Sequence, residues 1–129
     1  MKIPSGNSRE EIVIRDKAIK DFYAPWNAGH PDKKMWNESL QDYIHVRFLS
    51  IEETSEKEAR QYASTMAVFR LGELLTNARK VAEVDVKKGT KNQKPFVKML
   101  IMQLEDLKMT VGVQKSGNLI QYCITSTKK

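Results

Sequence analysis

His45 and Arg47 lie two positions apart in segment 43–50, YIHVRFLS, where apolar and polar residues alternate loosely. This alternation predicts a strand, on which both side chains point to the same face. An imidazole beside a guanidinium suits phosphodiester chemistry, because the imidazole can move a proton while the cation stabilises charge that builds on the phosphate. His45 is therefore the candidate acid–base group and Arg47 the candidate phosphate clamp, with Lys98 as an alternative clamp.

Structural roles stay open for the same residues. A lone histidine in a strand is commonly a structural hydrogen-bond donor, and Arg47 has acidic neighbours in the sequence with which it could pair. Lys98 interrupts the apolar segment 96–105 and could guard a sheet edge. Tyr122 is a candidate substrate-binding residue, and its alternative is a core position with the hydroxyl at the rim.

The sequence carries no recognisable metal or nucleotide motif. Its two histidines, His30 and His45, are fifteen positions apart, and Cys123 is its single cysteine. Ligand pairs at metal-binding spacing are therefore missing, and the six glycines form no phosphate-binding fingerprint. A single cysteine excludes an intramolecular disulfide and is most often a small buried apolar residue. We predict no cofactor and no metal.

Positive charge is concentrated in the second half of the chain. The 129 residues include 22 Lys and Arg against 16 Asp and Glu, a formal net charge of +6. Residues 1–64 carry a net charge of −1 and residues 65–129 one of +7. The polar loop 87–94 alone holds Lys87, Lys88, Lys91 and Lys94. We expect these lysines to contact the phosphates of RNA or another nucleic acid, and a solubilising basic surface is the alternative.

Helical patterns occupy the first part of the chain. A capping-box pattern at 8–11 predicts the start of a helix, and Pro25 predicts its end. A short helix is expected over 33–41. A second capping box at 55–58 predicts another helix, continued or followed by an apolar helical stretch over 65–75.

Strand patterns occupy the second part. Period-two alternation predicts strands over 80–86 and 107–114, and the long apolar run 96–105, broken only by Lys98 and Gln103, predicts another. The last predicted strand is 119–126. Short polar connections between these segments indicate an antiparallel meander. The predicted fold class is α+β, with N-terminal helices packed on a C-terminal four-stranded antiparallel meander.

The composition, 40% hydrophobic and 29% charged, is typical of a soluble globular protein. No segment is long and apolar enough to span a membrane, and residues 1–11 lack the apolar centre of a secretory signal. We expect a cytoplasmic protein with no membrane partner.

Several stretches resemble a known group of nucleases. They are the segment 43–50, the tripeptide Ala63-Ser64-Thr65, and the segments 111–113, VGV, and 121–125, QYCIT. Together with the order of helices and meander, they resemble the barnase–EndoU–colicin–RelE superfold of small metal-independent ribonucleases, in its phage-associated branch carried on mobile elements. The resemblance covers residues 43–129. Residues 1–42 are then an N-terminal helical extension that forms one compact domain with the nuclease-type region.

This resemblance implies RNA cleavage by metal-independent transesterification. Carried over residue by residue, it makes His45 the acid–base group and Arg47 a group that neutralises charge. Ser64, Thr65 and Thr125 would hold substrate phosphate or ribose, Thr125 within the catalytic set. The second catalytic histidine of EndoU-type members has no counterpart in the matching region.

Three functions therefore compete at this point. The first is a toxin-like or phage-associated ribonuclease. The second is a non-catalytic nucleic-acid-binding module on the same fold, for which binding should weaken with salt. The third is a protein-interaction domain of a mobile element, whose partner would be an inhibitor protein or another part of a polyprotein.

Overall fold

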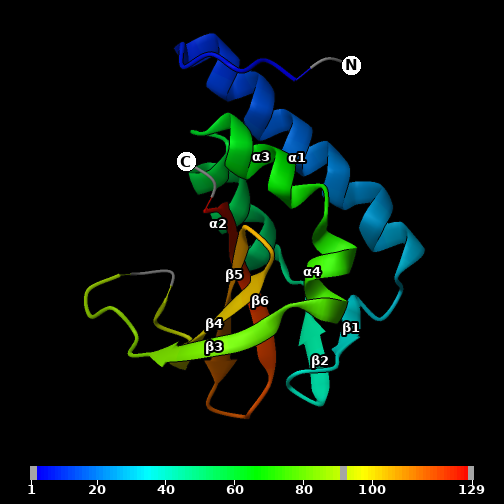
Figure 1. Ribbon diagram of the computed structural model, residues 1–129, viewed down its shortest axis with the longest axis vertical. Helices are drawn as coiled ribbons and strands as arrows, with labels where there is room; N and C mark the ends of the chain where they lie inside the picture. Colours follow the sequence, from blue (N-terminus) through cyan, green and yellow to red (C-terminus); the bar gives the residue numbers. More distant parts are fainter. Residues whose placement is uncertain (1–2, 91–92, 128–129) are drawn as a thin grey trace.

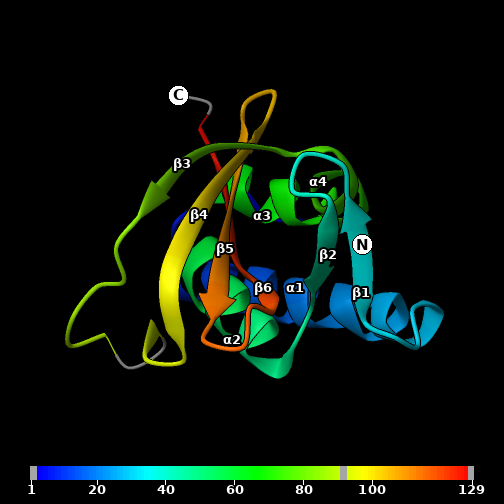
Figure 2. The same cartoon turned by 90° about the horizontal axis from the view of Figure 1, so that it is seen from below.

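The computed structural model describes residues 3–90 and 93–127. The elements in chain order are α1 (Arg9–Gly29), β1 (Lys34–Asn37), β2 (Asp42–His45), α2 (Phe48–Glu58), α3 (Tyr62–Val68), α4 (Leu71–Asn77), β3 (Arg79–Val84), β4 (Phe96–Leu104), β5 (Leu107–Gln114) and β6 (Leu119–Ser126) (Figure 1). The strands form one sheet in the order β1-β2-β6-β5-β4-β3, which curls like half a barrel (Figure 2). The α+β class and the C-terminal antiparallel meander, β3 to β6, are confirmed.

The sheet is larger than predicted, and it is mixed. β1 and β2 form an antiparallel hairpin in which Lys34 pairs with His45. β2 then runs parallel to β6, with His45 opposite Ile120. The helix predicted over 33–41 is wrong, because Asn37 is fully buried at the end of β1 and its amide donates to the carbonyls of Leu75 and Ala78. These two bonds fix β1 as the edge of the sheet next to α4.

Segment 43–50, predicted as one strand, divides between two elements. β2 ends at His45 and α2 begins at Phe48, which is seven residues before the predicted helix start. The Ser50 hydroxyl accepts a hydrogen bond from the Arg47 N–H at 3.0 Å, which satisfies the backbone where the helix begins. His45 and Arg47 therefore flank a strand-to-helix connection and do not share one strand.

Helix α1 continues past Pro25 to Gly29, so its predicted end is wrong. A proline within a helix costs about 3 kcal/mol, because it removes one hydrogen bond and crowds the preceding turn. Here Phe22, Tyr23 and Trp26 pack into the core on both sides of the proline. Their burial offsets the local cost, as tertiary packing commonly overrides intrinsic preference.

A buried hydrogen-bond chain joins the helices to β6. The Tyr23 hydroxyl donates to Gln121 Oε1 at 2.8 Å, and Gln121 Nε2 donates to Thr54 Oγ1 at 2.9 Å. Thr54 Oγ1 in turn donates to the Tyr122 carbonyl at 3.2 Å. These polar groups are satisfied inside the core, so they fix the position of α1 and α2 on the sheet. No helix of the described part of the chain is long and apolar enough to cross a membrane.

Candidate functional site

His45 and Arg47 line one pocket of about 530 Å³ where β2 meets α2. Lys33 and Lys34, from the end of the loop after α1 and the start of β1, line it as well. The Val46 N–H donates to the Lys33 carbonyl at 2.8 Å, which holds this loop against the β2–α2 connection. The remaining lining residues are Asn27, Asp32, Val46, Phe48 and Ile51. The pocket therefore gathers an imidazole and three cationic side chains.

The surroundings of His45 favour its neutral form. Burial lowers the pKa of the imidazole, and the positive charges of Arg47 and Lys34 lower it further, while Asp42 acts in the opposite direction. A histidine with a lowered pKa is neutral at pH 7 and can accept a proton. The positive charges of Arg47 and Lys34 lie beside this imidazole, so the pocket pairs a base with an anion site.

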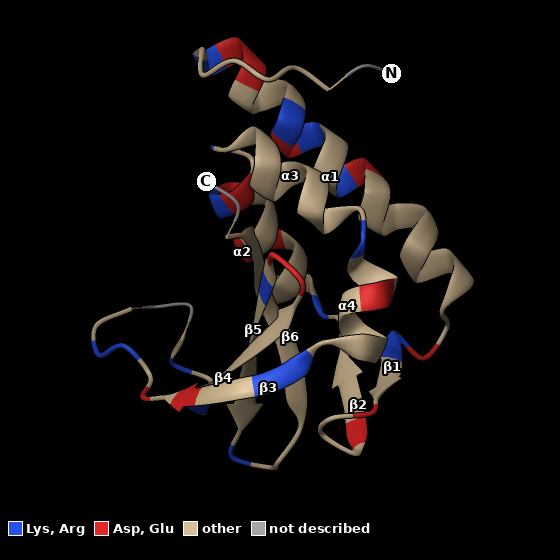
Figure 3. Ribbon diagram, in the orientation of Figure 1, with Lys and Arg blue, Asp and Glu red and all other residues tan. Residues whose placement is uncertain are grey.

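More lysines lie at the same end of the sheet as this pocket. β3 and β5 end there and β4 and β6 begin there, since Phe96 pairs with Gln114 and Ile120 lies opposite His45. Figure 2 shows the β3–β4 loop, the β5–β6 turn and the β2–α2 connection along one edge, and Figure 3 colours the basic residues of the first two. We call this rim the basic edge, and its residues are Lys33, Lys34, Arg47, Lys87, Lys88, Lys94 and Lys115.

The basic edge combines residues from both halves of the sequence. Of the predicted loop lysines, Lys87, Lys88 and Lys94 belong to it, and Lys91 lies outside the described residues. Asp32 and Asp85 are acidic residues of the same rim. Sequence reasoning missed Lys33 and Lys34, because β1, KMWN, has only four residues and no alternation that would identify a strand.

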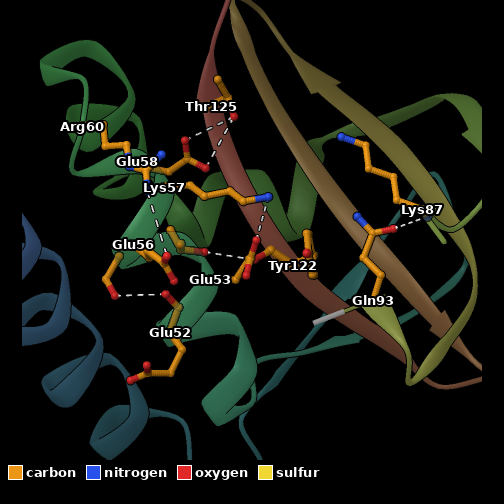
Figure 4. Close-up of polar contacts among 12 residues, drawn as sticks. Glu52, Glu53, Glu56, Lys57, Glu58, Arg60, Lys87, Gln93, Tyr122 and Thr125 are labelled. Atoms are coloured by element: carbon orange, nitrogen blue, oxygen red, sulfur yellow. Dashed lines mark hydrogen bonds and ion pairs between the residues drawn. The ribbon is translucent and has the colours of Figure 1, made fainter. Parts of the chain in front are cut away.

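A second, smaller cleft of about 240 Å³ holds two of the predicted substrate-binding residues, Lys87 and Tyr122. Lys57 and Lys108 also line it. The Lys57 ammonium lies 2.7 Å from the Glu53 carboxylate and 5.5 Å from the centroid of the Tyr122 ring (Figure 4). Burial raises the pKa of Tyr122 to about 12, so its hydroxyl stays neutral.

Thr125 lies apart from the His45 pocket. Its hydroxyl donates to the Glu58 carboxylate at 3.4 Å (Figure 4). Thr125 is five residues beyond Ile120 on β6, so it stands roughly 16 Å along the strand from the level of His45. One phosphate group cannot contact both side chains.

Ser64 and Thr65 are buried and hold α3 in place. Ser64 Oγ accepts from the Ser126 N–H at 3.2 Å, and Thr65 Oγ1 donates to the Glu58 carbonyl at 2.8 Å. The Ser64 and Thr65 residues are 1% and 0% exposed. The structure therefore places both hydroxyls in the joint between α2, α3 and β6, away from His45.

The structure also shows the surroundings of Lys98, a predicted substrate-binding residue, and of the single cysteine, Cys123. Lys98 lies on β4, an inner strand of the sheet, so it does not guard an edge, and its ammonium lies 3.0 Å from the carboxylate of Glu83 on the neighbouring strand β3. Burial raises the pKa of the Cys123 thiol to about 11. The thiol is therefore protonated at neutral pH, where only the thiolate would be a good nucleophile.

Across residues 3–90 and 93–127, no three His, Cys, Asp or Glu side chains form a group that could hold a metal ion. No family model matches the chain, and comparisons with curated proteins and with solved structures gave no match. The function must therefore be inferred from the chemistry of the pocket and its basic edge.

Proposed function

We propose that this protein binds RNA along the basic edge and cleaves it at the His45 pocket, without a metal ion. The observation that supports this proposal is the pocket itself. It joins an imidazole of lowered pKa to Arg47, Lys33 and Lys34, so a proton acceptor and an anion site are adjacent. The first turn of α2 also lines the pocket, and the amides of a helix N-terminus add to the attraction for an anion.

In this mechanism the neutral His45 imidazole takes the proton of a ribose 2′-hydroxyl. The 2′ oxygen then attacks the adjacent phosphorus, the bond from phosphorus to the 5′ oxygen breaks, and a 2′,3′-cyclic phosphate forms. The leaving 5′ oxygen takes a proton from water, to which the pocket is open. Arg47 and the two lysines stabilise the negative charge on the phosphate oxygens as the bond breaks.

The resemblance to small metal-independent ribonucleases supports the same chemistry. The α+β class and the C-terminal meander are compatible with it, and His45 is the residue that both arguments select. The catalytic set is smaller than the resemblance implied, because Thr125 contacts Glu58 and stands apart from the pocket. We therefore assign the reaction to His45 and Arg47.

The test is cleavage of RNA by the purified protein in the presence of EDTA, with His45→Ala, Arg47→Ala and His30→Ala in parallel. His30 is the matched control, since it stacks on Trp26 at 4.1 Å between ring centroids and does not line the pocket. Loss of a general base typically lowers the rate by about 10²–10⁴-fold. We expect that loss in His45→Ala, a lower rate in Arg47→Ala, and no loss in His30→Ala. Intact RNA with the wild-type protein, or equal cleavage by His45→Ala, would refute the proposal.

Non-catalytic binding of nucleic acid is the second candidate function. It is favoured by the separation of His45 from Thr125, which removes one member of the predicted catalytic set from the pocket. Uncleaved RNA that still binds in a salt-sensitive manner would select this candidate.

A further inference from the structure

One face of the β1–β2 hairpin continues the His45 pocket with aromatic side chains. Lys34 pairs with His45 and Trp36 pairs with Tyr43 across the two strands. Side chains two positions apart on a strand share a face, so these four side chains lie on the same side of the hairpin. The alternate residues, Met35 and Ile44, pack against the core on the opposite side. The pocket and the aromatic pair are therefore neighbouring parts of one surface.

The two aromatic rings are exposed and held in place. Trp36 is 40% exposed and Tyr43 is 42% exposed, and their ring centroids are 5.2 Å apart in an edge-to-face arrangement. Trp36 Nε1 donates to Glu38 Oε2 at 2.9 Å, and the Lys34 ammonium lies 4.5 Å from the centroid of the Tyr43 ring. Apolar rings that face solvent in a fixed orientation can receive a flat ligand without the cost of ordering them.

Exposed aromatic rings are concentrated at this surface. In the described part of the chain the exposed aromatic side chains are Trp36, Tyr43, Phe48 and Tyr62. Phe48 is 75% exposed and lines the His45 pocket. Tyr62 alone lies elsewhere, at the start of α3. Packing of the core does not explain why three of these four rings lie together, since none of the four is buried.

The two ends of the β1–β2 hairpin carry opposite charges. The pocket end is basic, with Lys33, Lys34 and the adjacent Arg47. The tip is acidic, with Glu38 and Asp42. A polyanion backbone is attracted to the pocket end and repelled from the tip. Bases attached to that backbone carry no charge, and they can extend over Trp36 while the phosphate stays in the pocket.

We propose that the exposed face of the β1–β2 hairpin is a stacking platform for unpaired nucleobases, so that the protein takes single-stranded nucleic acid. This inference rests on the proposed function and names the substrate class of the same site. Stacking on an aromatic ring requires a base that is not stacked inside a duplex. Such stacking has little sequence preference, because every base has a π face. In a duplex the base faces are stacked on one another, so none is free to lie on this surface.

The test measures binding and does not depend on cleavage. A short single-stranded deoxyoligonucleotide, an abasic strand of the same length and a duplex are compared, since none of them has the 2′-hydroxyl that the proposed reaction requires. The proteins are the wild type, Trp36→Leu and Tyr62→Leu. Leucine keeps apolar volume and removes the π face, and Tyr62 is an aromatic of similar exposure, at 39%, outside the platform.

We expect the wild type to bind the base-bearing strand on the order of 10-fold more tightly than the abasic strand. Trp36→Leu should remove that difference, and Tyr62→Leu should keep it. Equal affinity of the wild type for the two strands, or an unchanged difference in Trp36→Leu, would overturn the platform. Binding of the abasic strand measures the phosphate contacts of the pocket and the basic edge alone. If the platform fails, both strands bind equally, and if the phosphate site fails, the abasic strand does not bind.

Discussion

At the residue scale, environment decides what a side chain can do, and the two most informative groups are His45 and Glu58. Burial and two neighbouring cations lower the pKa of His45, which keeps this imidazole neutral and able to act as a base. Burial raises the pKa of Glu58 to about 7. Sequence reasoning selected His45 by its type and its spacing from Arg47, but no sequence signal distinguished Glu58 from the other acids of α2.

Glu58 makes stability depend on pH. The pKa of this carboxyl is raised from 4.5 to about 7, first by burial and also by Glu53, although Thr125, the backbone of Ile124 and Lys57 favour the charged form. The folded protein therefore holds this proton more tightly than the unfolded chain does. The stability that this bound proton gives to the folded state is fully present below about pH 4.5 and is lost as the pH rises through about 7. This contribution to the free energy of unfolding is about 3 kcal/mol at most.

Glu58→Gln should therefore flatten the pH dependence of the free energy of unfolding between about pH 5 and about pH 8. The variant should be more stable than the wild type at the upper end, where the wild-type carboxylate is charged. Glu56→Gln, an exposed position on the same helix, is the control and should leave the slope unchanged. Urea denaturation at several pH values measures the effect, and an unchanged slope in Glu58→Gln would contradict it.

At the element scale, the sequence predicted the long strands correctly, but it did not predict a very short strand or a helix that continues through a proline. Strand β5 follows from period-two alternation and β4 from a long apolar run, and the structure confirms the antiparallel pairing of β4, β5 and β6. Strand β1 has four residues, too few for a period to be recognised. The continuation of α1 through Pro25 depends on packing by residues distant in sequence, which local preference cannot reveal. Strand β1 and the last turn of α1 both line the pocket, so the sequence could not show that Lys33 and Lys34 belong to it.

Gly112 on β5 gives a test of how closely the meander is packed. A Cβ at this position would lie 2.5 Å from the ring of Phe96. The centroid of this ring is 5.9 Å from the centroid of the Tyr122 ring, in an edge-to-face contact. Gly112→Ala must displace a buried ring, and overpacking of this kind costs about 1–3 kcal/mol. We expect that loss in the free energy of unfolding, measured by chemical denaturation.

Gly72→Ala is the matched control, since the same substitution in α4 meets nothing within 4 Å. Alanine favours the helix by up to about 1 kcal/mol, so this variant should be as stable as the wild type or more so. Equal stability of the two alanine variants would show that the ring of Phe96 moves aside without cost.

At the scale of the whole molecule, the fold rearranges the charge of the sequence. The sequence places the whole positive excess in residues 65–129, so the lysines expected to meet a polyanion were there, and Arg47 was the one cation of the first half predicted to contact phosphate. In the structure, Lys33, Lys34 and Arg47 of the first half line the pocket at the β2–α2 connection, which lies along the same edge of the sheet as the β3–β4 loop and the β5–β6 turn (Figure 2). The parallel pairing of β2 with β6 causes this, because it brings the end of β2 to the start of β6.

Binding of single-stranded nucleic acid should therefore depend steeply on salt. Each phosphate contact contributes about −0.7 to the slope of log affinity against log salt for single strands. Lys87→Gln together with Lys88→Gln should reduce the magnitude of that slope by roughly 1.4. Lys17→Gln together with Lys20→Gln removes equal charge from α1, where both lysines pair with aspartates, and should leave the slope unchanged. Equal slopes in the two double variants would contradict a basic edge that contacts phosphate.

The most direct test of the central claim is an NMR titration of the two imidazoles, with and without inorganic sulfate as a phosphate mimic. His30→Gln assigns the two signals, since the chain has only these two histidines. We predict a His45 pKa below its ordinary value of 6.5 without sulfate, and a higher pKa with sulfate, because a bound anion favours the charged imidazole. In Arg47→Gln the pKa without sulfate should move back towards 6.5 and the effect of sulfate should shrink. A His45 pKa at or above 6.5 that sulfate does not change would contradict both the neutral base and the anion site.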